Sequence, residues 1–209
     1  MERKILRLKE AKPILDSIHK HLVSSIHEGF EDWLKIREFI NNFEGGPVNY
    51  KPRTKAGIIH EHIEKYIRIN LADTEGVIID EFNGVFGIHL QDELFIRFKK
   101  MDKDYATSNI STRQHRTFIK QGQIEGFPEK PTFLFAGYLP DNTWSTIKGV
   151  YVACWVGKNL EWVDEFGKYS VEQTILDFNE KEKEPFIEIE KRIKIKRAIG
   201  EDEKSNPAS

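Results

Sequence analysis

The sequence predicts an α+β protein. In it an N-terminal helical hairpin leads into a helix and an antiparallel three-stranded meander, and a crossing helix leads to a second antiparallel β set. Apolar residues recur at helical spacing up to Asn70 and at strand spacing from Val77 onward. An Asn83-Gly84 pair stands between two apolar runs, which is the strongest short signal of a β-hairpin. The 209 residues suit one domain with an appendage, since a domain has roughly 150 residues.

Residues 1–46 are predicted to form the helical hairpin. One apolar stripe with helical spacing ends near Ser25 and a second begins at Phe30. Gly29 lies between the two stripes and is therefore interpreted as the turn of the hairpin. The Glu-Gly-Gly-Pro segment at 44–47 ends the second helix, because glycine and proline both interrupt helices.

Residues 47–165 are predicted to form the α+β core, which opens with a helix capped by Thr54. Val77-Ile78-Ile79 is typical of a buried strand, and residues 85–90 pair back on it after the Asn-Gly turn. In the third strand, side chains alternate between two faces of the sheet. Its buried face is predicted to consist of Leu94, Ile96 and Phe98, with Phe95, Arg97 and Lys99 on the opposite face.

A polar loop and a further helix follow the meander. Ser111 or Thr112 can cap this helix, because both side chains can accept a hydrogen bond from a free backbone amide. The second antiparallel set is predicted at residues 132–139, 149–156 and 160–163. Residues 166–200 are interpreted as a helix or strand arm, and residues 201–209 as a disordered tail.

Composition excludes several classes of protein. Charged residues make up 32% of the chain, too many for a membrane protein, and aromatic residues make up 11%, too many for a disordered one. The single cysteine, Cys154, rules out an internal disulfide and a cysteine-based zinc site. Because no apolar run has the length of a signal peptide or a spanning helix, we expect a cytoplasmic protein without a membrane partner.

The net charge of −2 does not indicate any particular partner, but one segment of the chain has a clear excess of positive charge. Between Arg97 and Lys120 there are seven lysines and arginines and only two acids. If the intervening loop folds back, the strand pair Arg97 and Lys99 can meet the helical pair Arg113 and Arg116 as a fork for phosphate or carboxylate. The predicted ligand-binding residues of this basic face are Arg97, Lys99, Lys100, Asn109, Thr112, Arg113, Gln114 and Arg116. The alternative is an ordinary solvated charged surface.

The sequence predicts no catalytic residue, no metal and no cofactor. A restriction-endonuclease core needs carboxylates on a helix and a strand, and the chain offers Glu61, Glu64, Asp80 and Glu81. The acid-x-Lys strand is missing, since Glu93 and Lys99 would lie about 20 Å apart in an extended chain. His60 and His62 lack the spacing that places two imidazoles on one side of a helix. Cys154 lies inside an apolar strand, where an inert packed thiol is expected.

Several short segments carry a resemblance to a known family. They are Arg53-Thr54-Lys55-Ala56, Arg97-Phe98-Lys99-Lys100-Met101-Asp102, Asn109, Thr112-Arg113-Gln114 and Ala136-Gly137-Tyr138. Together they resemble uncharacterised bacterial proteins of mobile elements and prophages, often encoded beside a metalloprotease of the ImmA/IrrE kind with a repressor domain. The match covers roughly Arg53 to Trp162. The resemblance implies a phage-defence, toxin–antitoxin-like or prophage regulatory locus and a co-encoded partner, but no activity.

The leading hypothesis is a non-enzymatic binding or regulatory protein. Its basic face would bind DNA, RNA or an acidic co-encoded protein. One alternative is a nucleic-acid-processing enzyme, such as a divergent metal-dependent nuclease. The other is a structural subunit, including a homo-oligomer, that assembles through the aromatic strand residues Tyr151, Trp155 and Trp162.

Overall fold

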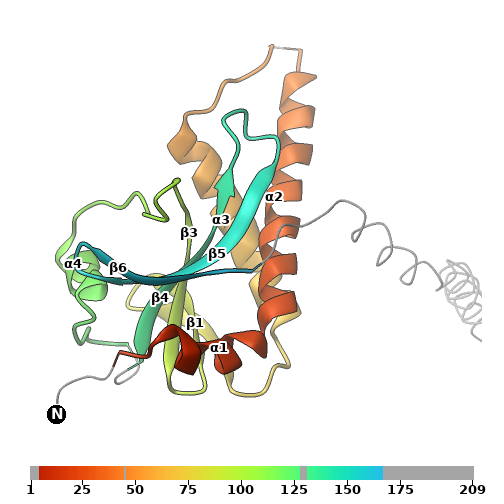
Figure 1. Cartoon of the computed structure of the whole chain (residues 1–209). Helices are drawn as coiled ribbons and strands as arrows, with labels where there is room; N and C mark the ends of the chain where they lie inside the picture. Colours follow the sequence, from red (N-terminus) through yellow and green to blue (C-terminus); the bar gives the residue numbers. More distant parts are fainter. Residues whose placement is uncertain (1–4, 45, 128–130, 167–209) are drawn as a thin grey trace, which may run out of the picture. The chain divides into compact units, whose positions relative to one another are not determined.

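A six-stranded sheet separates two unequal helical layers in this protein (Figure 1). The computed structural model describes residues 5–44, 46–127 and 131–166, which all belong to one compact unit. The α+β class is therefore confirmed, with helices first and strands after them. Except for Phe166, the predicted arm and tail lie outside the described residues.

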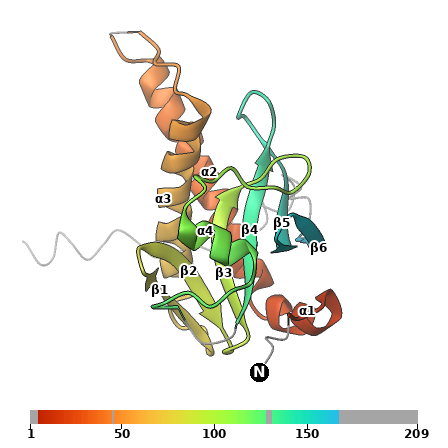
Figure 2. The ribbon, with the colours of Figure 1, turned by 90° about the vertical axis from the view of Figure 1, so that its left-hand side faces the viewer.

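Three helices form the larger layer, namely α1 (Leu8–Asp16), α2 (His19–Asn41) and α3 (Pro52–Asn70). The predicted turn at Gly29 is wrong, because α2 runs through this residue without a break. A Cβ atom at Gly29 would lie 2.7 Å from the backbone nitrogen of Ile63, so the glycine allows α2 and α3 to approach closely. The helical pair is thus α2 with α3, which lie side by side in both views (Figures 1 and 2).

Helix α3 begins earlier than the sequence predicted. Pro52 occupies its first turn, and the preceding residue, Lys51, makes no side-chain capping bond. The predicted cap at Thr54 is wrong because proline, with its fixed φ and missing N–H, starts a helix without a capping side chain. No helix in the described part of the chain is long and apolar enough to cross a lipid bilayer.

The antiparallel meander is confirmed as β1 (Val77–Phe82), β2 (Val85–Leu90) and β3 (Leu94–Lys100). Asn83 and Gly84 adopt φ values of 50° and 71°, as a two-residue hairpin turn requires. The predicted burial of the first strand is wrong: β1 lies at the edge of the sheet, and Ile78 is 54% exposed.

Strands β2 and β3 pair over an unusually short length. Ile88–Leu90 pairs with Leu94–Ile96, whereas β4 pairs with β3 along all of Leu94–Lys100. From Arg97 onward, β3 therefore has a strand partner on one side only among the described strands. Arg97 and Lys99 of the predicted basic face lie on this open half of β3.

The second antiparallel set is also confirmed, with strands β4 (Thr132–Pro140), β5 (Ile147–Val156) and β6 (Asn159–Glu165). The two sets merge into one sheet in the order β1-β2-β3-β4-β5-β6, because β3 and β4 pair in parallel. The chain between them contains α4 (Arg113–Ile119), which supplies the crossover that parallel strands need. Thr112 caps α4 by accepting a hydrogen bond from the N–H of His115 at 3.1 Å.

Both faces of the sheet are covered. Leu94, Ile96 and Phe98 are buried on the side of α2 and α3, as predicted. On the other side, α4 brings Phe118 onto a second aromatic core, where its ring stacks on that of Phe133 with 4.5 Å between centroids. Phe95 is fully buried in this core. The expectation of a single buried face is therefore wrong, and Arg97 and Lys99 lie on a covered face.

Candidate functional site

Arg97 and Lys99 project from β3 toward the side of the sheet that α4 covers. Both side chains are half-buried. The guanidinium of Arg97 lies 5.0 Å from the centroid of the buried Phe118 ring, which is a cation–π contact. Neither cation forms a hydrogen bond or an ion pair with any residue that the structure describes. Two positive charges thus lie two residues apart on one strand without a counter-charge among the described residues.

The surroundings of these cations disfavour their charge. Burial lowers the pKa of Arg97 to about 10. Burial also lowers the pKa of Lys99, and the charge of Arg97 lowers it further. The pKa of Arg97 is lowered by the loss of hydration alone, whereas that of Lys99 is lowered first by the loss of hydration and then by a like charge.

Two histidines from different layers share the electrostatic field of this pair. Burial lowers the pKa of His60, on α3, and of His115, on α4. The positive charges of Lys99 and Arg97 lower both pKa values further. Strand β2 pairs with β3 only as far as Ile96, and α3 packs on β3 from the face opposite α4 (Figure 2). We call Arg97, Lys99, His60 and His115 the Arg97–Lys99 site.

His115 contributes an unsatisfied polar atom to this site. Its Nδ1 is buried and has no hydrogen-bond partner in the part of the chain that the structure describes. The ring lies 6.4 Å from that of Phe135, between centroids. A buried polar atom without a partner is uncommon in folded proteins, and atoms of Trp33, His89 and Tyr138 share this property with Nδ1 of His115 in the described residues.

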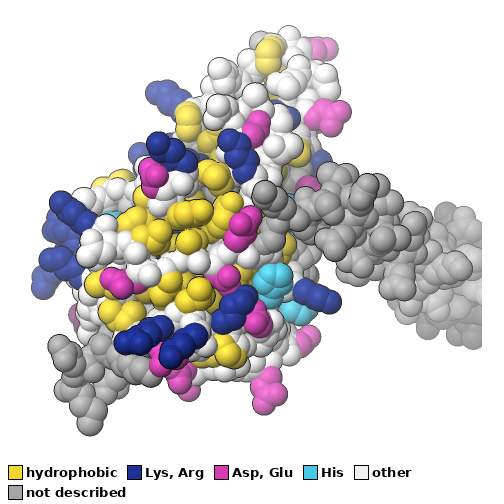
Figure 3. Space-filling view, in the orientation of Figure 1, with side chains coloured by type: hydrophobic (Ala, Val, Ile, Leu, Met, Phe, Trp, Pro, Cys, Tyr) yellow, Lys and Arg dark blue, Asp and Glu magenta, His cyan; other side chains and the backbone are white. Residues whose placement is uncertain are grey.

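The sequence predicted that the two cations of β3 meet Arg113 and Arg116 of α4, and the structure shows a different arrangement. His115, which lies between these two arginines on α4, is the residue that feels the charges of Arg97 and Lys99. Arg113 and Arg116 are solvent-exposed, and Arg116 donates to the carbonyl of Ser111 at 3.3 Å. Basic side chains gather where α4 lies, at the left edge of the molecule in Figure 3.

The neutral residues of the predicted site serve local structure. Thr112 is occupied as the helix cap. Gln114 donates to the carbonyl of Asn83 at 3.3 Å, which ties α4 to the β1–β2 turn. Asn109 donates to the hydroxyl of Thr107 at 2.6 Å within its own loop. Their amide and hydroxyl groups therefore support the shape of the site.

Lys100 lies apart from Lys99 because adjacent residues of a strand point to opposite faces. Its Nζ is 5.8 Å from the centroid of the Trp144 ring, and Nζ of Lys55 is 5.7 Å from the same centroid. Arg37 of α2 donates to the carbonyl of Trp144 at 3.0 Å. Lys100 thus belongs to a separate basic surface near the start of α3.

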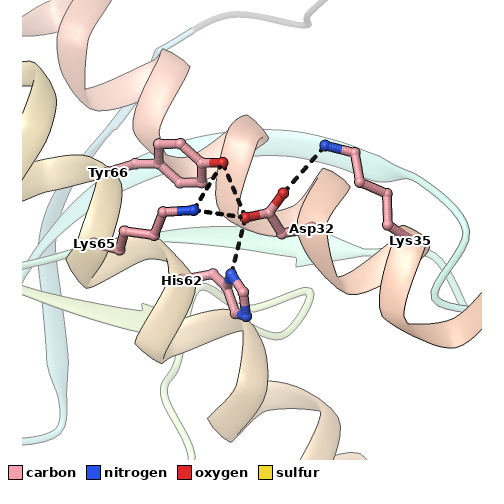
Figure 4. Close-up of polar contacts among 5 residues, drawn as sticks. All are labelled: Asp32, Lys35, His62, Lys65 and Tyr66. Carbon is pink, nitrogen blue, oxygen red and sulfur yellow. Dashed lines mark hydrogen bonds and ion pairs between the residues drawn. The ribbon is translucent and has the colours of Figure 1, made fainter. Parts of the chain in front are cut away.

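A second charged cluster joins α2 to α3 and was missed in the sequence (Figure 4). Asp32 is 13% exposed, and its Oδ2 lies 2.9 Å from Nδ1 of His62. The same oxygen accepts hydrogen bonds from the hydroxyl of Tyr66 at 2.9 Å and from Nζ of Lys65 at 3.3 Å. Oδ1 accepts one from Nζ of Lys35 at 3.2 Å. We call these five residues the Asp32 cluster.

The donors of the Asp32 cluster determine the charge of its carboxylate. Burial alone would raise the pKa of Asp32, but the hydrogen bonds from Tyr66, His62, Lys35 and Lys65 outweigh it and hold this pKa well below its usual range. The sequence offers only a weak signal of the cluster, since His62 and Tyr66 are four apart on α3. No pattern in the neighbouring sequence predicts that these two side chains contact α2.

Other groups with the potential for chemistry are occupied or inert. No three histidines, cysteines or acids among the described residues form a group that could hold a metal ion. Glu64 is 2.8 Å from the guanidinium of Arg68, and Asp80 is exposed. Burial raises the pKa of the Cys154 thiol to about 12, so the thiol is protonated at neutral pH.

The aromatic residues proposed for assembly have partners inside the chain. The indole N–H of Trp155 donates to the carbonyl of Tyr105 at 3.3 Å, and that of Trp162 to the carbonyl of Leu6 at 3.0 Å. Comparison of the chain with models of protein families, with curated proteins and with solved structures found no match.

Proposed function

We propose that this protein is a binding or regulatory module that holds nucleic acid by its phosphates, with the Arg97–Lys99 site as the main contact. The observation that supports the proposal is the half-burial of Arg97 and Lys99 without a counter-charge in the described chain. A buried charge without a partner costs several kcal/mol in a typical protein. An anionic ligand would offset that cost when it binds.

The residue types of the site suit a phosphate group. A guanidinium offers a planar set of donors that matches two phosphate oxygens, and an ammonium adds a compact point charge. The free Nδ1 of His115 supplies one more donor when that nitrogen carries the proton. A phosphate places several acceptor oxygens on one compact group, which can accept hydrogen bonds from more than one donor.

The exposed basic residues of α4 extend the site into solvent. Arg113 and Arg116 lie on either side of His115 in the sequence and are both exposed. Exposed cations contribute affinity for a polyanion by releasing its counter-ions, and this contribution weakens with salt. A phosphate at Arg97 and Lys99 and a backbone along α4 would together hold a nucleic-acid strand.

The cellular compartment and the genetic context of the protein are also proposed. The cytoplasm is the proposed compartment, because nucleic acid is available there. The mobile-element locus and the co-encoded partner stay predictions from the resemblance.

Binding of short DNA and RNA to the whole protein, measured by fluorescence anisotropy at several salt concentrations, tests the proposal. We expect Lys99→Met to weaken binding about tenfold and to lower the salt slope of log K by about one unit. The matched control is Lys158→Met, at an exposed turn position between β5 and β6, which should bind as the parent does.

Three results would contradict the proposal in different ways. If Lys99→Met binds as tightly as the parent, the Arg97–Lys99 site is not the contact. If the parent binds no nucleic acid, an acidic protein partner becomes the better hypothesis. If the oligonucleotide is cleaved in the presence of Mg²⁺, the nuclease alternative gains support.

A further inference from the structure

Three cations from three different elements contact one tryptophan in the turn between β4 and β5. Nζ of Lys55, on α3, and Nζ of Lys100, on β3, lie 5.7 Å and 5.8 Å from the centroid of the Trp144 ring. Arg37, on α2, donates from Nη1 to the carbonyl of Trp144 at 3.0 Å. We call these four residues the Trp144 surface. Segments that are far apart in the sequence thus bring three positive charges to one residue.

The turn between β4 and β5 fixes the position of the tryptophan. The φ of Trp144 is 58°, which is rare for a bulky residue, and its side chain is buried. Oδ1 of Asp141 accepts hydrogen bonds from the N–H groups of Ser145 and Thr146 at 2.7 Å and 3.0 Å. Asp141 is the only acid in the sequence of this turn, and its carboxylate is therefore engaged by the backbone.

The cations of the Trp144 surface have no counter-charge in the described chain. None of the three forms an ion pair with a described residue. Arg37 uses only Nη1 for its hydrogen bonds, which go to Thr143, Trp144 and Ser145. Its other nitrogens and both lysine Nζ atoms are not among the described atoms that are buried without a partner. These donors therefore face solvent and can bind a ligand.

The sequence beside the Trp144 surface adds further positive charge. Residues 46–60 contain the three cations Lys51, Arg53 and Lys55 and no aspartate or glutamate. Lys51 and Arg53 are exposed. Cations that come from several elements and continue into solvent fit an extended polyanion better than a single small anion.

We infer that the Trp144 surface is a second contact for the phosphate backbone of the nucleic acid. This inference rests on the proposed function and names a further surface that the nucleic acid contacts. Phosphates repeat along a strand with one negative charge each, so that separate cations can each neutralise one of them. Nε and Nη2 of Arg37 form a planar fork that matches two oxygens of one phosphate.

Lys100 places the Trp144 surface next to the Arg97–Lys99 site. Lys99 and Lys100 are consecutive on β3, and consecutive Cα atoms are about 3.8 Å apart. Their side chains point to opposite faces of the sheet. A single strand of about twelve nucleotides spans about 40 Å even in helical form, so it is long enough to contact both lysines.

Removal of two lysine charges from the whole protein tests the inference. We expect the Lys55→Gln, Lys100→Gln double variant to bind a DNA or RNA of about twelve nucleotides at least about tenfold more weakly than the parent, and to lower the salt slope of log K by about two units. Fluorescence anisotropy at several salt concentrations measures both. The Lys55→Arg, Lys100→Arg variant keeps both charges and should bind as the parent does.

The matched control removes the same amount of charge elsewhere. It is the Lys9→Gln, Lys20→Gln double variant, at exposed positions on α1 and in the first turn of α2. These positions lie at the opposite end of α2 from the turn between β4 and β5 (Figure 1). This control should bind as the parent does, because only lysines at the contact lose a phosphate.

Protection from acetylation tests the surface without any substitution. An amine-reactive acetylating reagent modifies lysines that face solvent, and mass spectrometry gives the rate at each one. The bound oligonucleotide should slow the acetylation of Lys55 and Lys100 but not that of Lys9 and Lys20. This measurement decides the inference if circular dichroism and thermal unfolding show that the glutamine variant is not folded.

The outcomes distinguish this inference from the proposed function. If the glutamine variant binds as the control does, or if Lys55 and Lys100 stay unprotected while the oligonucleotide binds, the inference fails, and weaker binding by Lys99→Met leaves the proposed function in place. If the glutamine variant loses affinity for polyglutamate but not for the oligonucleotide, the surface takes an acidic protein and the inference also fails. If the parent binds no oligonucleotide, the inference and the proposed function fail together.

Discussion

The Asp32 cluster and the Arg97–Lys99 site differ in whether their charged groups have polar partners among the described residues. Asp32 joins α2 to α3 and has four partners from the chain, including Tyr66 and His62 at 2.9 Å each. Arg97 and Lys99 are also half-buried between elements of the fold, but they have no polar partner among the described residues. The first arrangement is complete within the chain, and we propose that an external anion completes the second.

This difference separates structural charges from functional ones. A buried carboxylate with a full set of donors contributes to stability, because its hydrogen bonds offset its desolvation. A pair of like charges without a counter-charge lowers stability, and such local conflicts occur mainly where a protein binds or reacts. The account therefore predicts opposite effects when charges are removed from the two regions.

Removal of the Asp32 carboxylate should have the largest effect on stability. In Asp32→Ala, the hydroxyl of Tyr66 and Nδ1 of His62 lose their partner in a partly buried position. We expect the free energy of unfolding in urea to fall by about 2–3 kcal/mol. Glu61→Ala, at an exposed position of the same α3, is the control and should change it by less than about 0.5 kcal/mol. Equal effects of the two variants would show that the cluster adds nothing.

Acid should weaken the parent more than it weakens Asp32→Asn. Hydrogen bonds hold the pKa of Asp32 well below its value of about 3.9 in an unfolded chain, so its stabilisation is complete above that pH and is lost as the pH falls further. The difference in unfolding free energy between parent and variant should be constant above about pH 5. It should then shrink by up to about 1.4 kcal/mol per pH unit below about pH 4.

Comparison of the parent with Asp32→Asn removes the contributions that other acid-sensitive groups make to the free energy of unfolding. Burial lowers the pKa of His27 to about 4, so this histidine also makes the fold less stable as the pH falls from about 6.5. It does so in both proteins, and its contribution cancels. A gap that stays constant down to pH 2 would mean that Asp32 is not the titrating group.

Removal of the Lys99 charge should have a smaller effect on stability, with the opposite sign. In Lys99→Met, an uncompensated cation is replaced by an apolar side chain of similar length beside Arg97. We expect the free energy of unfolding to stay the same or to rise by about 1 kcal/mol, measured in urea without phosphate. A loss comparable to that of Asp32→Ala would show that Lys99 has a structural partner, and the comparison would fail.

Local signals in the sequence predicted much of the fold. The Asn83-Gly84 turn, the cap at Thr112 and the buried face with Phe98 all depend on neighbours within a few residues. The predictions are wrong at positions whose packing is determined by a segment far away in the sequence. Gly29 is a packing position only because Ile63 of α3 lies against it. The burial of Phe95 depends on α4, which covers a face that strand alternation alone leaves open.

The candidate site was predictable in part for the same reason. Arg97 and Lys99 stand in the most basic segment, so their role follows from local charge density. That Lys99 and Arg97 affect the pKa of His60 depends on the packing of α3 on β3, which no spacing in the sequence encodes. Three of the four partners of Asp32 lie thirty or more positions away on α3, and single-sequence patterns do not reveal such pairs.

The central claim is that an anion completes the Arg97–Lys99 site. Thermal unfolding of the parent and of Lys99→Met, in inorganic phosphate and in chloride at equal ionic strength, tests it most directly. Phosphate also stabilises proteins in general, and Lys99→Met measures that background. At several times the dissociation constant, phosphate should stabilise the parent by about 1 kcal/mol more than it stabilises Lys99→Met, which corresponds to an additional rise in Tm of about 2–4 °C. An equal rise in both proteins would contradict the account.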